Sequence, residues 1–248
     1  MRTLVVSDLH SNAGALRAVL AHVRRKRTDR IVCLGDFVGY GAQPNQVLDR
    51  MRTHRAAKLY IRGNHDRVAA GFDEGLDFNQ PARTAALWTR GKLSRPNQIF
   101  LRNLTVGPVT DDSGILFCHG SPADEDEYLF STRDIGSLKE AFPEPPIIFF
   151  GHTHIGVVFE ITPRGDVHAT PARSSMTFRL DPANQYVINP GSVGQPRDRI
   201  PLASCLIHDS ARATIQFFRV PYDVNATQRS IVDAGLPRLL AERLTAGT

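Results

Sequence analysis

Residues 147–159 read IIFFGHTHIGVVF, with two histidines enclosed between two short apolar runs. The first run, Ile147–Phe150, has the length and composition of a buried strand, so GHTH lies at the carboxyl end of that strand. In α/β proteins, ligands bind at the carboxyl ends of parallel strands. His152 and His154 can therefore face one ligand site if the backbone bends between them.

The amino-terminal part of the chain alternates short apolar strands with amphipathic helices. Strands are predicted at Arg2–Ser7, Ile31–Leu34 and Lys58–Ile61. Helices are predicted between them, from about Gly14 to Arg27 and from Pro44 to about His54. This β-α-β-α-β order indicates a parallel sheet flanked by helices, and hence an α/β protein.

The rest of the chain predicts a second, more antiparallel sheet. Residues 66–105 are expected to be mostly helical, and the acidic stretch 123–128 (ADEDEY) is interpreted as a solvated loop rather than a cation site. FPEPP (142–146) should end any regular structure before Ile147. The polar stretch 170–177 shows no apolar period and should be mobile. Further strands are predicted at 105–109, 115–118, 157–161, 186–188, 204–207 and 214–218. With no repeat and no linker, we expect one domain over residues 1–248, with a C-terminal helical segment at about 224–246 that is interrupted near Pro237.

Composition indicates a folded cytoplasmic protein. The 248 residues are 42% hydrophobic and 22% charged, and no apolar run approaches the roughly 20 residues that a membrane span needs. The first residues lack the long apolar core of a secretory signal. Cys33, Cys118 and Cys205 fit no zinc motif, which favours buried thiols in a reducing compartment. No feature of the sequence indicates an oligomeric state.

The net charge of +5 is compatible with anionic substrates. The one dense basic tract, RRKR (residues 24–27), lies at the end of a predicted helix. Basic side chains at that position suit the helix dipole, so we interpret the tract as a solvated helix end rather than a nucleic-acid patch.

Five polar motifs each follow a predicted strand directly, and a parallel sheet would bring them to one edge. Carboxylates, imidazoles and one amide oxygen would then converge, which is the ligand set of Zn, Mn, Fe, Ni or Co. Any one of these motifs alone is a weak signal, whereas all five in this order are specific. The motifs are DLH (8–10), GD (35–36), GNHD (63–66), CHG (118–120) and GHTH (151–154).

The ordered set resembles the calcineurin-like metallophosphoesterases, whose pattern is DxH, GD, GNH(D/E), GH or HG, and GHxH. The resemblance covers about residues 1–220. The longer forms GDFVGYG, GNHDRVAAG, CHGSP and NPGSVGQPRD are similar to the compact bacterial and archaeal branch of that family. The resemblance implies a four-layer αββα sandwich, in which two mixed β-sheets are flanked by helices.

The resemblance also implies a role for each motif residue. Two divalent transition-metal ions, each Mn, Fe, Zn, Ni or Co, would be bound, with Asp36 as the bridging ligand. His65 would face the substrate phosphate, and Asp66 would orient His65. The remaining ligands would be Asp8, His10 and His154 for one ion and Asn64, His119 and His152 for the other.

The implied function is hydrolysis of phosphodiester or phosphomonoester bonds in small substrates by a metal-bridging hydroxide. Nucleotides and dinucleoside polyphosphates are the first substrates to consider. A nuclease is the enzymatic alternative, but the chain has no added DNA-binding domain and no basic stripe with interleaved aromatic residues. A non-catalytic scaffold of the same fold is the third hypothesis, and the complete set of ligand positions argues against it.

Three further residues have two interpretations each. Arg197, in NPGSVGQPRD, can meet a substrate phosphate as a planar fork or form a surface salt bridge with Asp198. Tyr40 can stack on a base or cover the metal loop. Asn12 can touch a phosphate oxygen or cap the helix that follows it.

Overall fold

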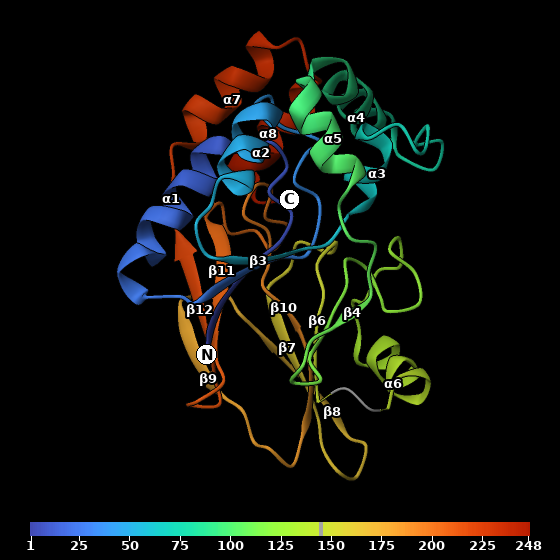
Figure 1. Ribbon diagram of the computed structural model, residues 1–248, viewed down its shortest axis with the longest axis vertical. Coiled ribbons are helices and arrows are strands. Elements are labelled where there is room, and N and C mark those ends of the chain that lie inside the picture. The colour runs from blue at the N-terminus through green and yellow to red at the C-terminus, as the bar shows by residue number, and fades with distance from the viewer. Residues whose placement is uncertain (144–145) are drawn as a thin grey trace.

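The computed structural model describes residues 1–143 and 146–248, so two residues of the predicted break at 142–146 lie outside the described residues. The strands form two six-stranded sheets, with helices outside both of them (Figure 1). In the first sheet the order is β3-β2-β1-β11-β12-β9, and its strands are β1 (Arg2–Val6), β2 (Arg30–Cys33), β3 (Ala57–Tyr60), β9 (Met176–Arg179), β11 (Ala203–Asp209) and β12 (Thr214–Val220). In the second sheet the order is β4-β5-β6-β10-β7-β8, and its strands are β4 (Val109–Thr110), β5 (Leu116–Phe117), β6 (Ile147–Phe149), β7 (Val157–Ile161), β8 (Val167–Pro171) and β10 (Gln185–Asn189).

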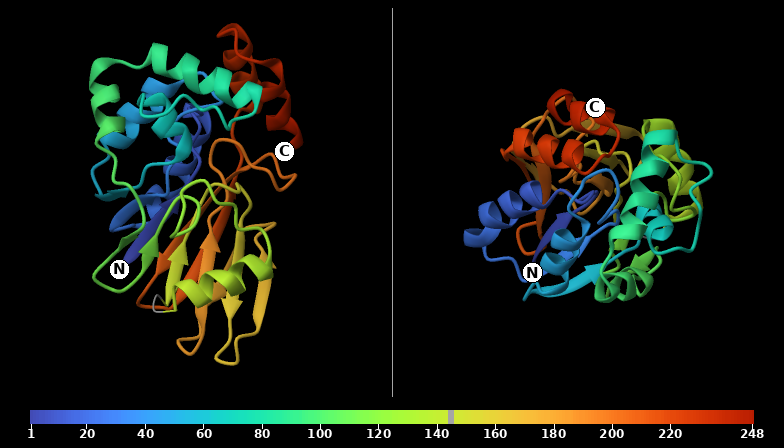
Figure 2. Two further views of the ribbon diagram at one scale, coloured as in Figure 1. Left: turned by 90° about the vertical axis from the view of Figure 1, so that its right-hand side faces the viewer. Right: turned by 90° about the horizontal axis from the view of Figure 1, so that it is seen from above.

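Both sheets are mixed. In the first, β1, β2 and β3 are parallel, and β11, β12 and β9 continue the sheet in antiparallel register. In the second, β5, β6 and β10 are parallel, and the outer strands β4, β7 and β8 are antiparallel. The C-terminal strands therefore join both sheets, and do not form a separate antiparallel one. The expected four-layer αββα sandwich is confirmed (Figure 2).

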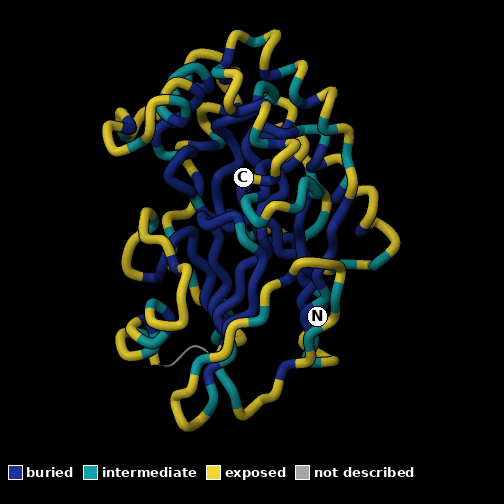
Figure 3. The backbone as a smooth tube through the Cα atoms, turned by 180° about the vertical axis from the view of Figure 1, so that it is seen from behind, coloured by how far each residue is buried: buried dark blue, intermediate teal, exposed yellow. Residues whose placement is uncertain are grey.

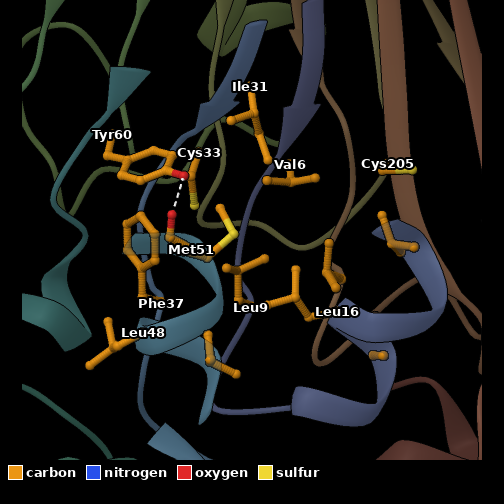
Figure 4. Packing of buried hydrophobic residues seen from close by; sticks show 14 of the residues in the cluster. Val6, Leu9, Leu16, Ile31, Cys33, Phe37, Leu48, Met51, Tyr60 and Cys205 are labelled. Atoms are coloured by element: carbon orange, nitrogen blue, oxygen red, sulfur yellow. Dashed lines mark hydrogen bonds between the residues drawn. The ribbon is translucent and has the colours of Figure 1, made fainter. Parts of the chain in front are cut away.

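Most strand residues are buried (Figure 3), and alternating side chains of the first sheet belong to two different apolar clusters. On β1, Val5 faces the second sheet, whereas Leu4 and Val6 face the helices. Helices α1 and α2 pack on that outer face, where the Tyr60 hydroxyl donates to the carbonyl of Met51 at 2.9 Å (Figure 4). The helices are α1 (Ala13–Val23), the 3₁₀ turn η1 (Arg24–Lys26), α2 (Pro44–Arg52), α3 (Asn64–Ala69), α4 (Gln80–Lys92), α5 (Arg95–Arg102), α6 (Thr132–Ala141), α7 (Val224–Asp233) and α8 (Arg238–Ala246).

The other helices complete the outer layers. Ile135 and Leu138 of α6 pack on the outer face of the second sheet. Helices α4, α7 and α8 share a further apolar cluster that includes Tyr40, so the C-terminal helices cover the loop after β2. The expected break between the last two helices is present, because α8 begins directly after Pro237.

One local expectation holds only in part, and one helix was missed. Residues 172–175 are irregular, but the two ends of the stretch 170–177 belong to β8 and β9, the edge strands of the two sheets. Their side chains are mostly exposed, so they show no apolar period. Helix α6 was not predicted, although Ser131 and Asp134 form a capping box at its start, a signal that sequence can carry. Among the described residues, no helix is long and apolar enough to cross a membrane.

Candidate metal centre and substrate cavity

The five motifs meet at one edge of the two sheets. Asp8, Asp36 and Asn64 follow β1, β2 and β3, which run parallel, so their strand ends lie side by side. His119 and His152 follow β5 and β6, the parallel pair of the second sheet. The centre therefore lies across the two sheets, as the parallel arrangement predicted.

Potential ligand atoms gather in two groups that share one carboxylate. Within each group, these atoms all lie within 4.8 Å of one another. Asn64 adds its amide oxygen to the second group, 3.2 Å from Nε2 of His119. One group consists of Asp8, His10, Asp36 and His154, and the other of Asp36, His119 and His152.

Backbone carbonyls determine which ring nitrogens can bind a cation. Nδ1 of His10 lies 2.9 Å from the carbonyl oxygen of Val38, and Nδ1 of His119 lies 2.8 Å from that of Leu34. Nδ1 of His154 lies 2.6 Å from the carbonyl oxygen of Gln195. A carbonyl only accepts, so each Nδ1 carries a proton, and each Nε2 has a lone pair when the ring is neutral.

His152 is held through its other ring nitrogen. Its Nε2 lies 3.1 Å from the carbonyl oxygen of Asp126, which leaves Nδ1 as the free acceptor. The ring also stacks on Tyr128, with centroids 3.9 Å apart. Sequence reasoning missed Gln195 and Tyr128, although NPGSVGQPRD and ADEDEY contain them.

The centre is therefore a buried cluster of acceptors, and two cations fit it. Both carboxylate oxygens of Asp8 and Oδ2 of Asp36 are buried without a hydrogen-bond partner among the described residues. An unpartnered buried carboxylate is strongly unfavourable, and a bound cation would compensate for it. Mixed nitrogen and oxygen donors suit Mn, Fe, Zn, Ni or Co.

The electrostatics of the cluster favour positive charge at the shared carboxylate. Burial by itself raises the pKa of Asp36, but the imidazoles of His119 and His65 outweigh it and hold that pKa below its usual range. Burial lowers the pKa of His119, yet the adjacent Asp36 raises it to about 10. Burial raises the pKa of Asp8 to about 7.

The backbone bends sharply at the candidate ligands. A positive φ in a residue other than glycine costs on the order of 1–3 kcal/mol and occurs mainly at functional sites. Gly63 allows the close approach of the third motif, because a Cβ there would collide with the Asp36 carboxylate. Positive φ angles occur at Asp8 (55°), His10 (43°), Asp36 (54°), His152 (64°) and His154 (62°).

His65 lies beside the cluster, but Asp66 does not orient it as expected. The two carboxylate oxygens of Asp66 accept from the backbone N–H groups of Val38 and Gly63, at 3.2 and 3.1 Å. Nδ1 of His65 is buried without a partner among the described residues. Asp66 is thus occupied by the backbone, because it sits in the first turn of α3 and caps that helix.

Aromatic packing positions the His65 ring instead. It lies between Tyr40 and Phe78, with ring centroids 4.4 and 4.6 Å away. Gly39, with a φ of 90°, leaves room for it, since a Cβ at Gly39 would collide with the imidazole. Burial lowers the pKa of His65 to about 4.

The structure excludes one of the two interpretations of Arg197, the salt bridge with Asp198, and leaves the phosphate contact as a prediction. Its guanidinium donates to the Tyr40 hydroxyl at 3.1 Å and to Oε1 of Gln195 at 3.4 Å. Asp198 instead pairs with Arg219, so the Arg197–Asp198 salt bridge is not formed. Arg197 therefore turns toward the centre.

Tyr40 and Asn12 both serve the fold at this edge. Tyr40 is buried and lies 4.4 Å from the His10 ring, as a cover of the metal loop would. Asn12 accepts from the N–H of Ala15 and donates to the carbonyl of Gly194, each at 3.0 Å. Asn12 is therefore the cap of α1, which is one of its two interpretations, and the phosphate contact stays untested.

A cavity of about 470 Å³ opens beside His65 and His152. Phe78 and Tyr128 contribute aromatic surface to it, and neither was predicted from sequence as a site residue. The acidic loop forms part of the rim, where Glu125 pairs with Arg67 and, at 2.9 Å, with Arg62. This confirms that 123–128 is a loop, held by arginines.

Comparison with known proteins identifies relatives of the whole chain. Residues 1–212 match the calcineurin-like phosphoesterase superfamily domain. An uncharacterised protein of Methanocaldococcus jannaschii is 38% identical over 248 residues, covering 98% of this chain and 97% of that protein. The crystal structure of a metallophosphoesterase from Sphaerobacter thermophilus has a TM-score of 0.86 at 36% identity and covers 100% of this chain and 99% of that one.

A more limited similarity is found to the symmetrical bis(5'-nucleosyl)-tetraphosphatase of Pectobacterium carotovorum subsp. carotovorum. It is 30% identical over 121 residues, which is 48% of this chain and 43% of that enzyme.

Proposed function

Because the chain belongs to the calcineurin-like phosphoesterase superfamily, we propose that it hydrolyses phosphoester bonds of small substrates with the aid of two bound divalent metal ions. The observation that carries this proposal is the position of Asp36, which belongs to both groups of ligand atoms. A carboxylate shared in this way is what a two-ion centre requires, whereas a single ion would not need seven candidate ligands.

The residues have distinct roles in the proposed reaction. Asp8, His10 and His154 would hold one divalent ion, Asn64, His119 and His152 would hold the other, and Asp36 would be shared between them. Such ions, when bound, would supply an activated water and neutralise charge on the phosphoryl oxygens.

In this proposal two side chains act on the substrate and a third covers the rings beside them. The imidazole of His65 donates a hydrogen bond to a phosphoryl oxygen or to the leaving oxygen. Arg197 adds positive charge from the opposite side of Tyr40, to which it is hydrogen bonded. Tyr40 itself covers His10 and His65 and excludes water from behind them.

Direct transfer of the phosphoryl group to water is part of the proposal. Among the described residues, no serine, threonine or cysteine lines the cavity beside the centre, so these residues offer no such nucleophile for a covalent intermediate. Hydrolysis in ¹⁸O-water with inversion at phosphorus supports this assignment, and isolation of a covalent phosphoenzyme would contradict it.

The cavity supports a small substrate with an uncharged group beyond the scissile phosphate. Phe78 and Tyr128 suit a flat group such as a nucleobase. The similarity to a tetraphosphatase supports testing nucleotides as well as diesters. The lining also contains Asp73, Asp77, Asp124 and Asp126 but one arginine, Arg67, and this excess of carboxylates favours a diester over a long polyphosphate chain.

Metal reconstitution tests the proposal. The protein is stripped of metal, supplied with Mn²⁺, Ni²⁺, Co²⁺, Fe²⁺ or Zn²⁺ singly, and assayed on bis-p-nitrophenyl phosphate and p-nitrophenyl phosphate. We expect metal-restored turnover with the diester preferred. Turnover of the monoester alone would indicate a phosphatase. Two bound ions per chain without turnover of either compound would contradict the enzymatic proposal and support a scaffold.

A further inference from the structure

A second, larger cavity of about 1190 Å³ lies away from the metal centre. Helix α1, the turn η1 and the segment around the end of α2 form its walls, with the short connections to β2 and β3. Six arginines line it, together with His54, Thr28 and Thr53, and no aspartate or glutamate of the described residues does so. We call this cavity the basic groove; its arginines are Arg17, Arg24, Arg25, Arg27, Arg50 and Arg55.

The charge of the basic groove is uncompensated. All six arginines are exposed, and none forms an ion pair or side-chain hydrogen bond within the part of the chain that the structure describes. Six positive charges exceed the net charge of the whole protein, +5, so the rest of the chain carries a net charge of −1. Solvated arginines on an ordinary surface are interspersed with carboxylates, and this concentration of one sign indicates an anionic ligand.

The basic groove lies at the opposite edge of the first sheet from the metal centre. Helix α1 begins at Asn12, which bonds Gly194 beside the centre, and it ends eleven residues later at the groove. At 1.5 Å per residue, this helix spans about 16 Å. Helix α2 runs from the loop after β2 to the same groove and lies against α1 (Figure 1). A ligand in the groove is therefore separate from a substrate at the metal centre.

The shape and lining of the groove select among anionic ligands. The large side chains exposed elsewhere on the protein, such as Phe72 and Leu76, do not line it, and a concave surface does not fit a flat bilayer. Within the part of the chain that the structure describes, no phenylalanine, tyrosine or tryptophan lines it, so it offers no platform for stacked bases. Leu20 and Ala21 provide apolar surface between the guanidinium groups, and this suits a chain in which phosphates alternate with sugars.

We propose that the basic groove binds a nucleic-acid strand through its sugar–phosphate backbone, without regard to base sequence. Guanidinium groups pair with phosphates in a bidentate manner, and the Thr28 hydroxyl can donate to the same oxygens, whereas that of Thr53 already donates to the carbonyl of Asp49. The groove would then dock the protein on a strand while the metal centre remains open to small substrates. The RRKR tract, interpreted from sequence as a solvated helix end, contributes three of its four residues to this surface.

The test is fluorescence anisotropy with a labelled 20-nucleotide oligo(U) RNA and oligo(dT) DNA, at several salt concentrations, with the strand checked for integrity afterwards. Binding should weaken linearly on a log–log plot against salt, by about 0.7 per phosphate contacted. The triple variant Arg24→Gln, Arg25→Gln, Arg50→Gln should bind at least tenfold more weakly at low salt, and its slope should be shallower by about 2.

A matched triple variant tests whether binding depends on the basic groove itself or only on the overall positive charge of the protein. Arg133→Gln, Arg164→Gln and Arg238→Gln removes three exposed arginines on α6, on the turn between β7 and β8 and on α8. This variant should bind like the unmodified protein. Equal weakening by both variants would overturn the proposal, as would the absence of binding to either strand.

Two competitors identify the ligand class. Inorganic polyphosphate and vesicles of phosphatidylglycerol are tested for binding to the same protein. If either of them binds and neither oligonucleotide does, the assignment to nucleic acid is overturned. Phosphoesterase turnover should be the same in the groove variant and the unmodified protein, so the outcome does not depend on the function proposed for the metal centre.

Discussion

The Nε2 atoms of His10 and His154 lie 3.1 Å apart, while Nδ1 of each ring faces a backbone carbonyl oxygen. Two neutral imidazoles in these tautomers direct lone pairs at each other, and nearby Asp8 and Asp36 add only further acceptors. A cation between the rings would accept both lone pairs. The first two predictions below depend on this arrangement.

The first prediction concerns the shared carboxylate. Asp36→Asn should lower the occupancy of both metal ions, because one substitution removes charge from both groups of ligand atoms. Elemental analysis should find close to two divalent ions per chain in the unmodified protein and less than one in the variant. Asp112→Asn, at an exposed position, is the control and should keep both ions. Loss of only one ion would show that Asp36 does not bridge.

The second prediction concerns His65. His65→Ala should keep both ions, because the His65 ring is not in either group of ligand atoms. Turnover should fall by about 10²–10⁴, the usual contribution of a positioned acid–base or hydrogen-bonding group. Metal analysis and steady-state kinetics on the same preparation check both parts. His168→Ala, on an exposed edge strand, should change neither. A loss of metal in the His65 variant would mean that the ring is a ligand.

The third prediction concerns Asp66, whose carboxylate binds the backbone and not His65. An asparagine offers one acceptor oxygen for the two N–H groups of Val38 and Gly63, so one of them would be left buried and unpaired. Asp66→Asn should therefore lower the free energy of unfolding by about 1–3 kcal/mol. Urea denaturation measures this difference. A variant of unchanged stability but greatly reduced turnover would support the orienting role that sequence reasoning assigned.

The fourth prediction concerns pH and His208, which lies on β11 near Phe149, between the two sheets. Burial lowers its pKa to about 4, although Asp209 opposes this. In the unfolded chain the pKa is about 6.5, so the unfolded state takes up a proton first as pH falls. Above pH 6.5, His208 does not lower the free energy of unfolding. As the pH falls from 6.5 to 4, protonation of His208 in the unfolded chain lowers the free energy of unfolding by up to about 1.4 kcal/mol per pH unit.

Denaturation at pH 7 and pH 5 compares the unmodified protein with His208→Gln. The unmodified protein should lose more stability over this interval, because glutamine takes up no proton. His168→Gln serves as the exposed control and should follow the unmodified protein. Parallel losses in the unmodified protein and the His208 variant would contradict the prediction.

Local sequence was sufficient for most of the metal centre. Each motif follows a short apolar run, and a run of that kind forms a buried strand with a turn after it. Parallel strands then bring their carboxyl ends to one edge. Asp8, Asp36 and Asn64 therefore lie close together, whatever the positions of the other strands in the two sheets. The candidate ligands could therefore be named without knowledge of the tertiary structure.

The partners of individual side chains required the tertiary structure. Arg197 is next to Asp198 in the chain but bonds Tyr40, 157 residues away, while Asp198 pairs with Arg219. Asp66 is next to His65, yet its oxygens point to the backbone of Val38 and Gly63. Side chains adjacent in sequence point in different directions from a helix or a turn, so adjacency does not predict contact.

The sequence by itself determined which polar motifs follow the strands and the edge of the sheet on which they meet, because short-range apolar patterns specify strands and their ends. Only the tertiary structure decided which sheet each C-terminal strand joined, and only it showed that Arg17, the RRKR tract and the arginines near the end of α2 line one groove. These features depend on contacts between segments far apart in the chain, and such contacts leave no periodic pattern in any one segment.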